Sequence, residues 1–149
     1  MTYIVGASLI LGLAIAAPAA TIDHSARLDH HSGPVDTRYR GTVSVNHKQV
    51  GAVAPGGRPS TLRCMWSADM TVDRHATTAA GTVMIRRISR EGVVSGNLSG
   101  WCDTHKASIA KEFAVRMQTM DRHLTAVAQE DHEHLRLELD HLHGPTRTG

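Results

Sequence analysis

Histidine and carboxylate side chains that could bind a metal ion are concentrated near the end of the chain. The sequence has 11 histidines in 149 residues, and three potential ligands, His134, Glu138 and His141, are separated by four and three positions. This spacing puts them on one side of an α-helix, with His132 close by. Imidazole nitrogens and carboxylate oxygens suit zinc, copper or nickel. The pattern therefore indicates a candidate divalent-metal site, although a solvated polar helix face has the same composition.

A complete metal site needs ligands from outside this helix. One helix rarely supplies a tetrahedral set alone, and the chain lacks the H-E-x-x-H signature of zinc hydrolases. The missing ligands would come from a second helix, from a partner chain, or from the N-terminal histidines His24, His30 and His31. These histidines are relevant only if the N-terminal stretch folds back.

Catalytic motifs are missing from the sequence. Residues 96–100 do not form the G-x-S-x-G nucleophile motif, and residues 55–58 lack the Gly-Lys-Ser/Thr ending of a phosphate loop. The formal net charge is only +2, and the sequence shows no basic patch interleaved with aromatic residues. We therefore expect a non-enzymatic protein that does not bind nucleic acid.

The first residues have the features of an export signal. An apolar run over residues 4–17 is followed by Ala17-Pro18-Ala19, an A-x-A cleavage pattern. We predict a signal peptide over residues 1–19, although its start lacks the usual lysine or arginine. An uncleaved anchor is the alternative, but the run is short for a membrane span. The mature protein is then expected to be periplasmic or secreted, without a membrane span.

The two cysteines of the chain, Cys64 and Cys102, are expected to form a disulfide. In an oxidising compartment an isolated pair is most simply a structural bond, which would close a loop of about 39 residues and stabilise the fold by roughly 4 kcal/mol on the chain-entropy model. A redox pair and two metal thiolates are the alternatives. Redox centres usually use a close C-x-x-C, which is absent here. We expect Trp66 and Trp101 to pack beside the bond.

A long C-terminal helix is the clearest structural prediction. Apolar residues recur every three or four positions over residues 104–143, Asp103 suits the N-cap, and Gly144-Pro145 supplies the end. Such a helix would be about 60 Å long, whereas strands usually span about 17–20 Å. Its C-terminal half is therefore expected to project, to bend back or to pair with another chain.

Three leucines near the end of this helix are candidate interaction residues. Leu135, Leu139 and Leu142 have coiled-coil-like spacing, but only over about two heptads. They would contact a protein partner or a second copy of the chain, or they would pack on the chain's own sheet.

Alternating apolar and polar residues predict an α+β fold, an antiparallel β-meander of about four strands with one long C-terminal helix. We expect a flexible N-terminal arm over residues 20–37, a single disulfide-stapled domain over residues 38–143, and a disordered tail over residues 144–149. The last two strands are predicted to form a hairpin that turns at residues 90–92. The predicted strands cover residues 38–45, 62–72, 83–89 and 93–99.

These features favour a binding protein over an enzyme. We expect a protein-interaction or envelope structural role through the long helix. The alternative is a divalent-metal-binding periplasmic protein that uses the ligands named above. A third interpretation is a small secreted inhibitor that presents a loop such as Asn46–Pro59.

Overall fold

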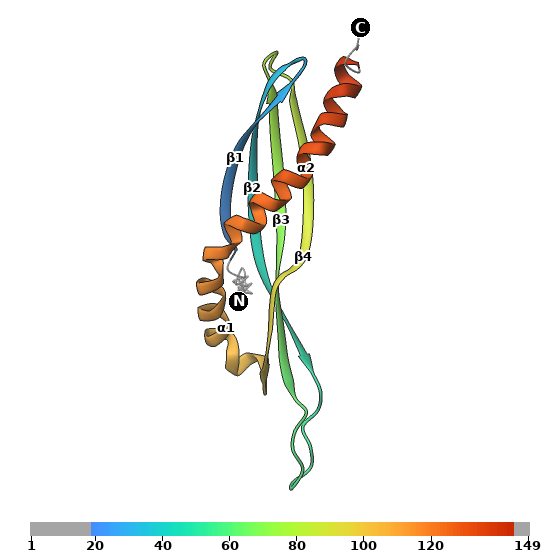
Figure 1. Ribbon diagram of the computed structural model, residues 1–149. Helices are drawn as coiled ribbons and strands as arrows, with labels where there is room; N and C mark the ends of the chain where they lie inside the picture. The colour runs from blue at the N-terminus through green and yellow to red at the C-terminus, as the bar shows by residue number, and fades with distance from the viewer. Residues whose placement is uncertain (1–18, 145–149) are drawn as a thin grey trace, which may run out of the picture.

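The computed structural model describes residues 19–144, so residues 1–18 of the predicted signal peptide and residues 145–149 of the predicted tail lie outside the described part. The fold is α+β, as predicted: four antiparallel strands in the order β1-β2-β3-β4, followed by a helical region (Figure 1). The elements are β1 (Ala20–His30), β2 (Gly33–Val50), β3 (Arg63–Thr78), β4 (Val83–Ser99), α1 (Cys102–Arg116), the 3₁₀ turn η1 (Met117–Thr119) and α2 (Met120–His143).

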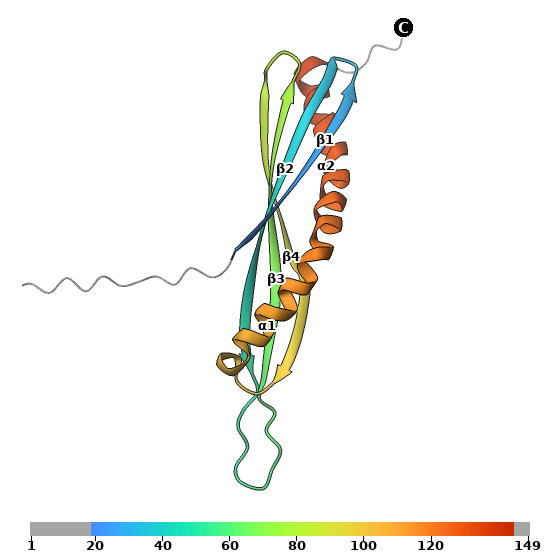
Figure 2. The ribbon, with the colours of Figure 1, turned by 90° about the vertical axis from the view of Figure 1, so that its left-hand side faces the viewer.

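The strands are much longer than we expected, and this changes the position of the helix. β2, β3 and β4 contain 18, 16 and 17 residues, which corresponds to about 50–60 Å at the usual rise of a strand. Both helices therefore lie along one face of the sheet, and α2 does not project from a small domain (Figures 1 and 2).

The segment predicted to be a flexible arm, residues 20–37, is part of the sheet. It forms β1 and the beginning of β2, which pair from Ala20 opposite Val43 to His30 opposite Gly33. The prediction was wrong because small or polar residues occupy several inward positions of β1 and hide its alternation. Leu28 is nevertheless buried under α2.

The predicted hairpin over residues 83–99 is a single strand, β4, with a bulge. The register against β3 shifts so that residues 91–93 lie opposite the single residue Asp69. Gly92 has a φ of 59° and its amide donates to the Asp69 carboxylate over 2.8 Å. A glycine that suggests a hairpin turn is here the positive-φ residue of a bulge, where a left-handed backbone angle is also needed.

The helical region is bent rather than straight. The helix begins at Cys102, so Asp103 is not the N-cap but lies in the first turn, where it pairs with Lys106. The 3₁₀ turn η1 changes the direction of the chain between α1 and α2 (Figure 1). This lets α1 cover one end of the twisted sheet and α2 the other. No helix in residues 19–144 is long and apolar enough to cross a bilayer.

Two apolar clusters lie between the helices and the sheet. The larger one joins β2, β3 and β4 to α1 and the first half of α2, and it contains Trp66, Phe113 and Leu124. The smaller one lies near the end of α2 and contains Leu28, Val35, Ala76, Leu135 and Leu139. The helix thus buries its apolar stripe on the chain's own sheet.

The predicted disulfide between Cys64 and Cys102 is present, with an S–S distance of 2.08 Å and a Cα–Cα distance of 4.7 Å. It ties β3 to the first residue of α1. Trp66 is buried in the same apolar cluster as Cys64, as expected, but Trp101 is 54 % exposed. Trp101 directly precedes α1.

Candidate metal site

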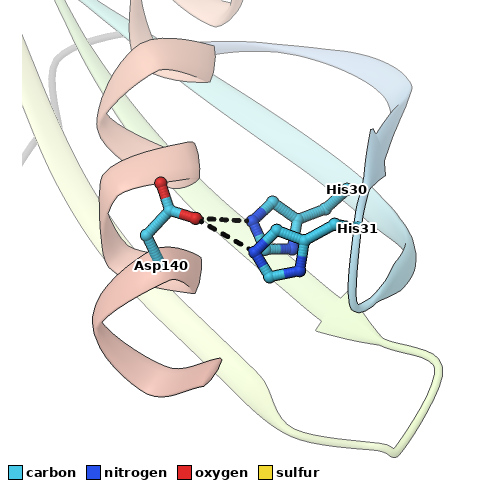
Figure 3. Close-up of side chains that lie close together, drawn as sticks. All are labelled: His30, His31 and Asp140. Atoms are coloured by element: carbon cyan, nitrogen blue, oxygen red, sulfur yellow. Dashed lines mark hydrogen bonds and ion pairs between the residues drawn. The ribbon is translucent and has the colours of Figure 1, made fainter. Parts of the chain in front are cut away.

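Two histidines from the β1–β2 turn and one aspartate from α2 form a compact cluster. The Nε2 atoms of His30 and His31 lie 3.1 Å and 3.3 Å from the same carboxylate oxygen, Oδ1 of Asp140 (Figure 3). One potential ligand atom from each residue lies within 4.8 Å of the other two. Among residues 19–144 this is the only such group of three or more histidine, cysteine or carboxylate ligands.

The hairpin between β1 and β2 explains why two consecutive histidines point the same way. Neighbouring residues within a strand point to opposite faces. His30 is the last residue of β1 and points inward, whereas His31 already belongs to the turn and escapes this alternation. Gly33, with a φ of 122°, closes the turn. Both rings therefore reach α2 (Figure 3).

The smaller apolar cluster positions the helical ligand. Leu135 and Leu139 on α2 are fully buried against Leu28 and Val35 of the first hairpin. Because Asp140 directly follows Leu139, its side chain points from the edge of this contact toward the turn. The same packing that holds α2 on the sheet thus fixes the distance between the carboxylate and the imidazoles.

Hydrogen bonds define the protonation of the cluster. The hydrogen bond from His30 lowers the pKa of Asp140; partial burial opposes this shift, and His31 adds to it. The carboxylate is therefore ionised at neutral pH. The other ring nitrogen of His30, Nδ1, lies 2.7 Å from the hydroxyl of Ser32. The backbone amide of Ser32 donates to the same Nδ1 over 3.3 Å, so Nε2 carries the hydrogen that it donates to Asp140. A metal ion at Nε2 would displace this proton, and the contacts at Nδ1 would fix the ring orientation.

Two of the three distances within the cluster match those between ligands of a transition-metal ion. Around a tetrahedral ion with bonds of about 2.0–2.1 Å, neighbouring ligands lie roughly 3.3–3.4 Å apart. The two nitrogen–oxygen distances, 3.1 and 3.3 Å, are close to this value. The site also lies one turn from the end of α2, where the negative end of the helix dipole favours a cation.

The cluster is partly open to solvent. The side chain of His30 is 6 % exposed, whereas those of His31 and Asp140 are 29 % and 40 % exposed. Three ligands leave at least one position of a tetrahedral ion for water or another ligand. The arrangement can therefore hold an ion that remains accessible from outside.

The residues predicted from helical spacing do not form this site. Glu138 accepts a hydrogen bond from Arg74, and His132 lies beside the ring of Tyr39 at a centroid distance of 6.4 Å. His134 and His141 are exposed, and neither joins a group of three ligands. Even spacing along one helix does not bring the side chains to a common point, because they project outward from a convex surface.

Two of the three candidate interaction leucines pack on the chain's own sheet. Leu135 and Leu139 are core residues, so they are not available to a partner. Leu142 is 56 % exposed. Of the two alternatives, packing on the chain's own sheet therefore holds for Leu135 and Leu139, because the long strands cover α2 nearly to its end.

A buried charge network lies between the two apolar clusters and escaped the sequence analysis. Asp131 on α2 accepts hydrogen bonds from Arg74 over 3.0 Å, from Arg86 over 2.9 Å and from Tyr39 over 3.2 Å. Burial raises the pKa of the Tyr39 hydroxyl, and the nearby Asp131 carboxylate raises it further. These charges neutralise one another, which favours a structural role.

Comparisons with protein-family models, with curated proteins and with solved structures find no match. The function proposed below therefore depends on the geometry of the chain itself.

Proposed function

We propose that this protein binds a divalent transition-metal ion, zinc, copper or nickel, through His30, His31 and Asp140. The observation that carries the proposal is the convergence of three ligand atoms within 4.8 Å, with both nitrogen–oxygen distances suited to such an ion. Two imidazoles and a carboxylate match the preference of these metals for nitrogen with some oxygen. The proposal keeps the metal-binding alternative from the sequence but moves its centre from the helix to the β1–β2 turn.

The proposed compartment is the cell envelope or the exterior. The Cys64–Cys102 disulfide is typical of an oxidising environment. The first strand begins at Ala20, immediately after the predicted cleavage position at Ala19, so removal of the leader would leave the sheet intact. Both features support export of the folded domain.

The proposed role is reversible metal binding without a catalytic step. An accessible ion with an open coordination position exchanges more readily than one enclosed by four protein ligands. The exposure of His31 and Asp140 supports this role. The protein would then buffer or carry the ion.

Calorimetric titration of the oxidised, chelator-treated protein with zinc, copper and nickel tests the proposal. We expect one ion per chain and a higher unfolding temperature, because an ion at 100 times its Kd stabilises the native state by about 2.7 kcal/mol. His31→Asn and Asp140→Asn each remove a ligand and should weaken binding at least tenfold.

His134→Asn is the matched control, because His134 is an exposed histidine of α2 outside the cluster. It should leave the affinity unchanged. Binding that is lost in His134→Asn but kept in Asp140→Asn would move the site back to the helix face. No binding of any of the three ions would refute the proposal.

A further inference from the structure

The end of the molecule that carries the disulfide also carries a protruding loop. Residues 51–62 join β2 to β3 and extend beyond the sheet, on the side away from the metal cluster (Figures 1 and 2). We call these residues the finger. Its two arms are joined by a backbone hydrogen bond from Thr61 to Ala52, and Arg58 bonds to Pro55 across its tip.

The base of the finger is firmly held. The side chain of Gln49 donates to the carbonyl groups of Arg63 and Gly100 and accepts a bond from the amide of Cys102. The amide of Gly100 donates to the carbonyl of Leu62, and the Cys64–Cys102 disulfide lies two residues further along each of these two segments. Three chain segments thus meet at one fixed junction, which holds the finger in a defined direction.

Basic side chains at this end have no acidic partner. Lys48, Arg58 and Arg63 are exposed, and within residues 19–144 none of them forms an ion pair. Residues 37–68 contain no aspartate or glutamate. On the rest of the sheet, by contrast, arginines such as Arg40 and Arg87 are paired with aspartates. Among the described strands and the finger, unpaired lysine and arginine side chains are therefore confined to this end.

Large apolar side chains are exposed at the same end. Val53 in the finger, Met65 on β3 and Trp101 at the base are 61 %, 48 % and 54 % exposed. Tryptophan, methionine and arginine are enriched at protein–protein interfaces, and tryptophan and arginine are common hot-spot residues. The chain has only two tryptophans, and one of them is exposed here.

We infer that the finger end is a docking surface for a protein partner whose binding cleft is lined with aspartate and glutamate. The finger enters the cleft with Arg58 near its tip, and Trp101 packs on the rim. Lys48 and Arg63 steer the approach and pair with acidic groups around the cleft. The fixed base lowers the entropy lost on docking, because the finger is already oriented.

A protein cleft fits this end better than an anionic bilayer. The tip, residues 55–59, consists of Pro-Gly-Gly-Arg-Pro and has no large apolar side chain. Inserted into hydrocarbon, its backbone amides would lack hydrogen-bond partners. Trp101 lies at the base, behind the charged tip, whereas a membrane anchor places its apolar groups in front.

Photo-cross-linking in the source cells tests this inference. The probe is p-benzoyl-phenylalanine, placed at Val53 and, as the matched control, at Leu137, an equally exposed residue of α2. We expect one discrete adduct from position 53 and none from position 137. Mass spectrometry should place the cross-link in a segment of the partner rich in aspartate and glutamate.

Charge reversal makes the test specific. Arg58→Glu/Arg63→Glu should reduce the adduct at least tenfold, whereas Lys111→Glu/Arg122→Glu, the same change of charge at two exposed helix residues, should not. Adducts that are equal at both positions, that survive the finger reversal, or that join two copies of this chain overturn the inference. So does binding of the purified protein to phosphatidylglycerol vesicles that the finger reversal abolishes. Metal affinity is measured separately, so its failure would not be confused with these outcomes.

Discussion

Asp140 is the residue that holds the candidate metal site together, because both imidazoles meet at one of its oxygens. Without a metal, the same contact ties the β1–β2 turn to α2. The hydrogen bond from His30 lowers the pKa of Asp140 in the folded state, against opposing burial and with further help from His31. Ionisation of this carboxylate therefore stabilises the native protein.

The sign of this effect predicts the behaviour of Asp140→Asn in acid. The stabilisation is fully present above the ordinary aspartate value of 3.8 and is lost as the pH falls through the lowered folded pKa. With chelator present, the variant should unfold at a lower temperature than the parent at pH 6. The two unfolding temperatures should converge as the pH falls below the lowered pKa of Asp140. Thermal unfolding between pH 2 and pH 6 measures this. Asp121→Asn, on the same helix and exposed, is the control; an equal effect there would contradict the assignment.

Arg74 is the residue whose loss should damage the fold most. Its side chain is fully buried and bonds to Asp131 and Glu138. Arg74→Ala leaves the buried Asp131 carboxylate with less compensation and should destabilise the protein by about 3–5 kcal/mol in urea unfolding. Arg74→Met/Asp131→Leu removes both charges and should recover part of that loss. A double variant less stable than Arg74→Ala would show that the network does more than neutralise buried charge.

The packing of β4 against β3 depends on the absence of a side chain at Gly96, which faces the indole ring of Trp66. A methyl group on Gly96 would lie 2.6 Å from the indole nitrogen of Trp66, a residue that is itself buried beneath Arg116 of α1. Gly96→Ala should therefore destabilise the protein by about 1–3 kcal/mol, because the rigid indole has to move. Gly56→Ala, in the finger with nothing within 4 Å, should stay within about 0.5 kcal/mol in the same urea titration. Equal effects of both changes would mean that the sheet accommodates the extra methyl group.

The sequence predicts a strand correctly where apolar and polar residues alternate clearly. It fails where polar residues occupy both faces of the strand. The alternation from Leu62 to Val72 predicted the buried face of β3, and with it the position of Cys64. In β1 the inward positions include His24, Ala26 and His30, so the alternation is polar on both faces, and the strand was taken for an arm. Its burial comes from α2, which a local pattern does not contain.

The sequence indicated His30 and His31 only as supplementary ligands, and Asp140 escaped prediction for a related reason. A helical wheel compares residues of one element, whereas the ligands of this cluster are separated by about 110 positions in the chain. The usable signal was Asp29-His30-His31-Ser32-Gly33, a histidine pair before a turn glycine, but only the hairpin shows which helix residue it meets. Asp140 lay beside the predicted ligand His141 and was not selected, because a one-residue shift on a helix rotates the side chain by about 100°.

The whole molecule is a long sheet that is joined to the helices by a different contact at each end, a disulfide at one and histidine–aspartate hydrogen bonds at the other. The disulfide joins β3 to α1 at the end of β2 that pairs with Cys64, and the histidine cluster joins the β1–β2 turn to α2 at the opposite end of β2 (Figures 1 and 3). About 50–60 Å of strand separates them. The smaller apolar cluster, with five buried residues, supports only the histidine end. The histidine end is therefore the one with fewer buried apolar residues.

This asymmetry predicts where zinc and reductant act in the native protein. Zinc should slow amide hydrogen exchange in residues 29–34 and in the last two turns of α2, because the ion joins these segments directly. It should leave residues 49–50 and 100–104 at the finger base unchanged. Reduction of Cys64–Cys102 should speed exchange at the finger base and leave the turn unaffected. Mass spectrometry of peptic fragments resolves the two regions. Protection by zinc at both ends would show instead that the bent α1–α2 segment transmits the effect of the ion along the sheet, so that metal occupancy would also change the presentation of the finger.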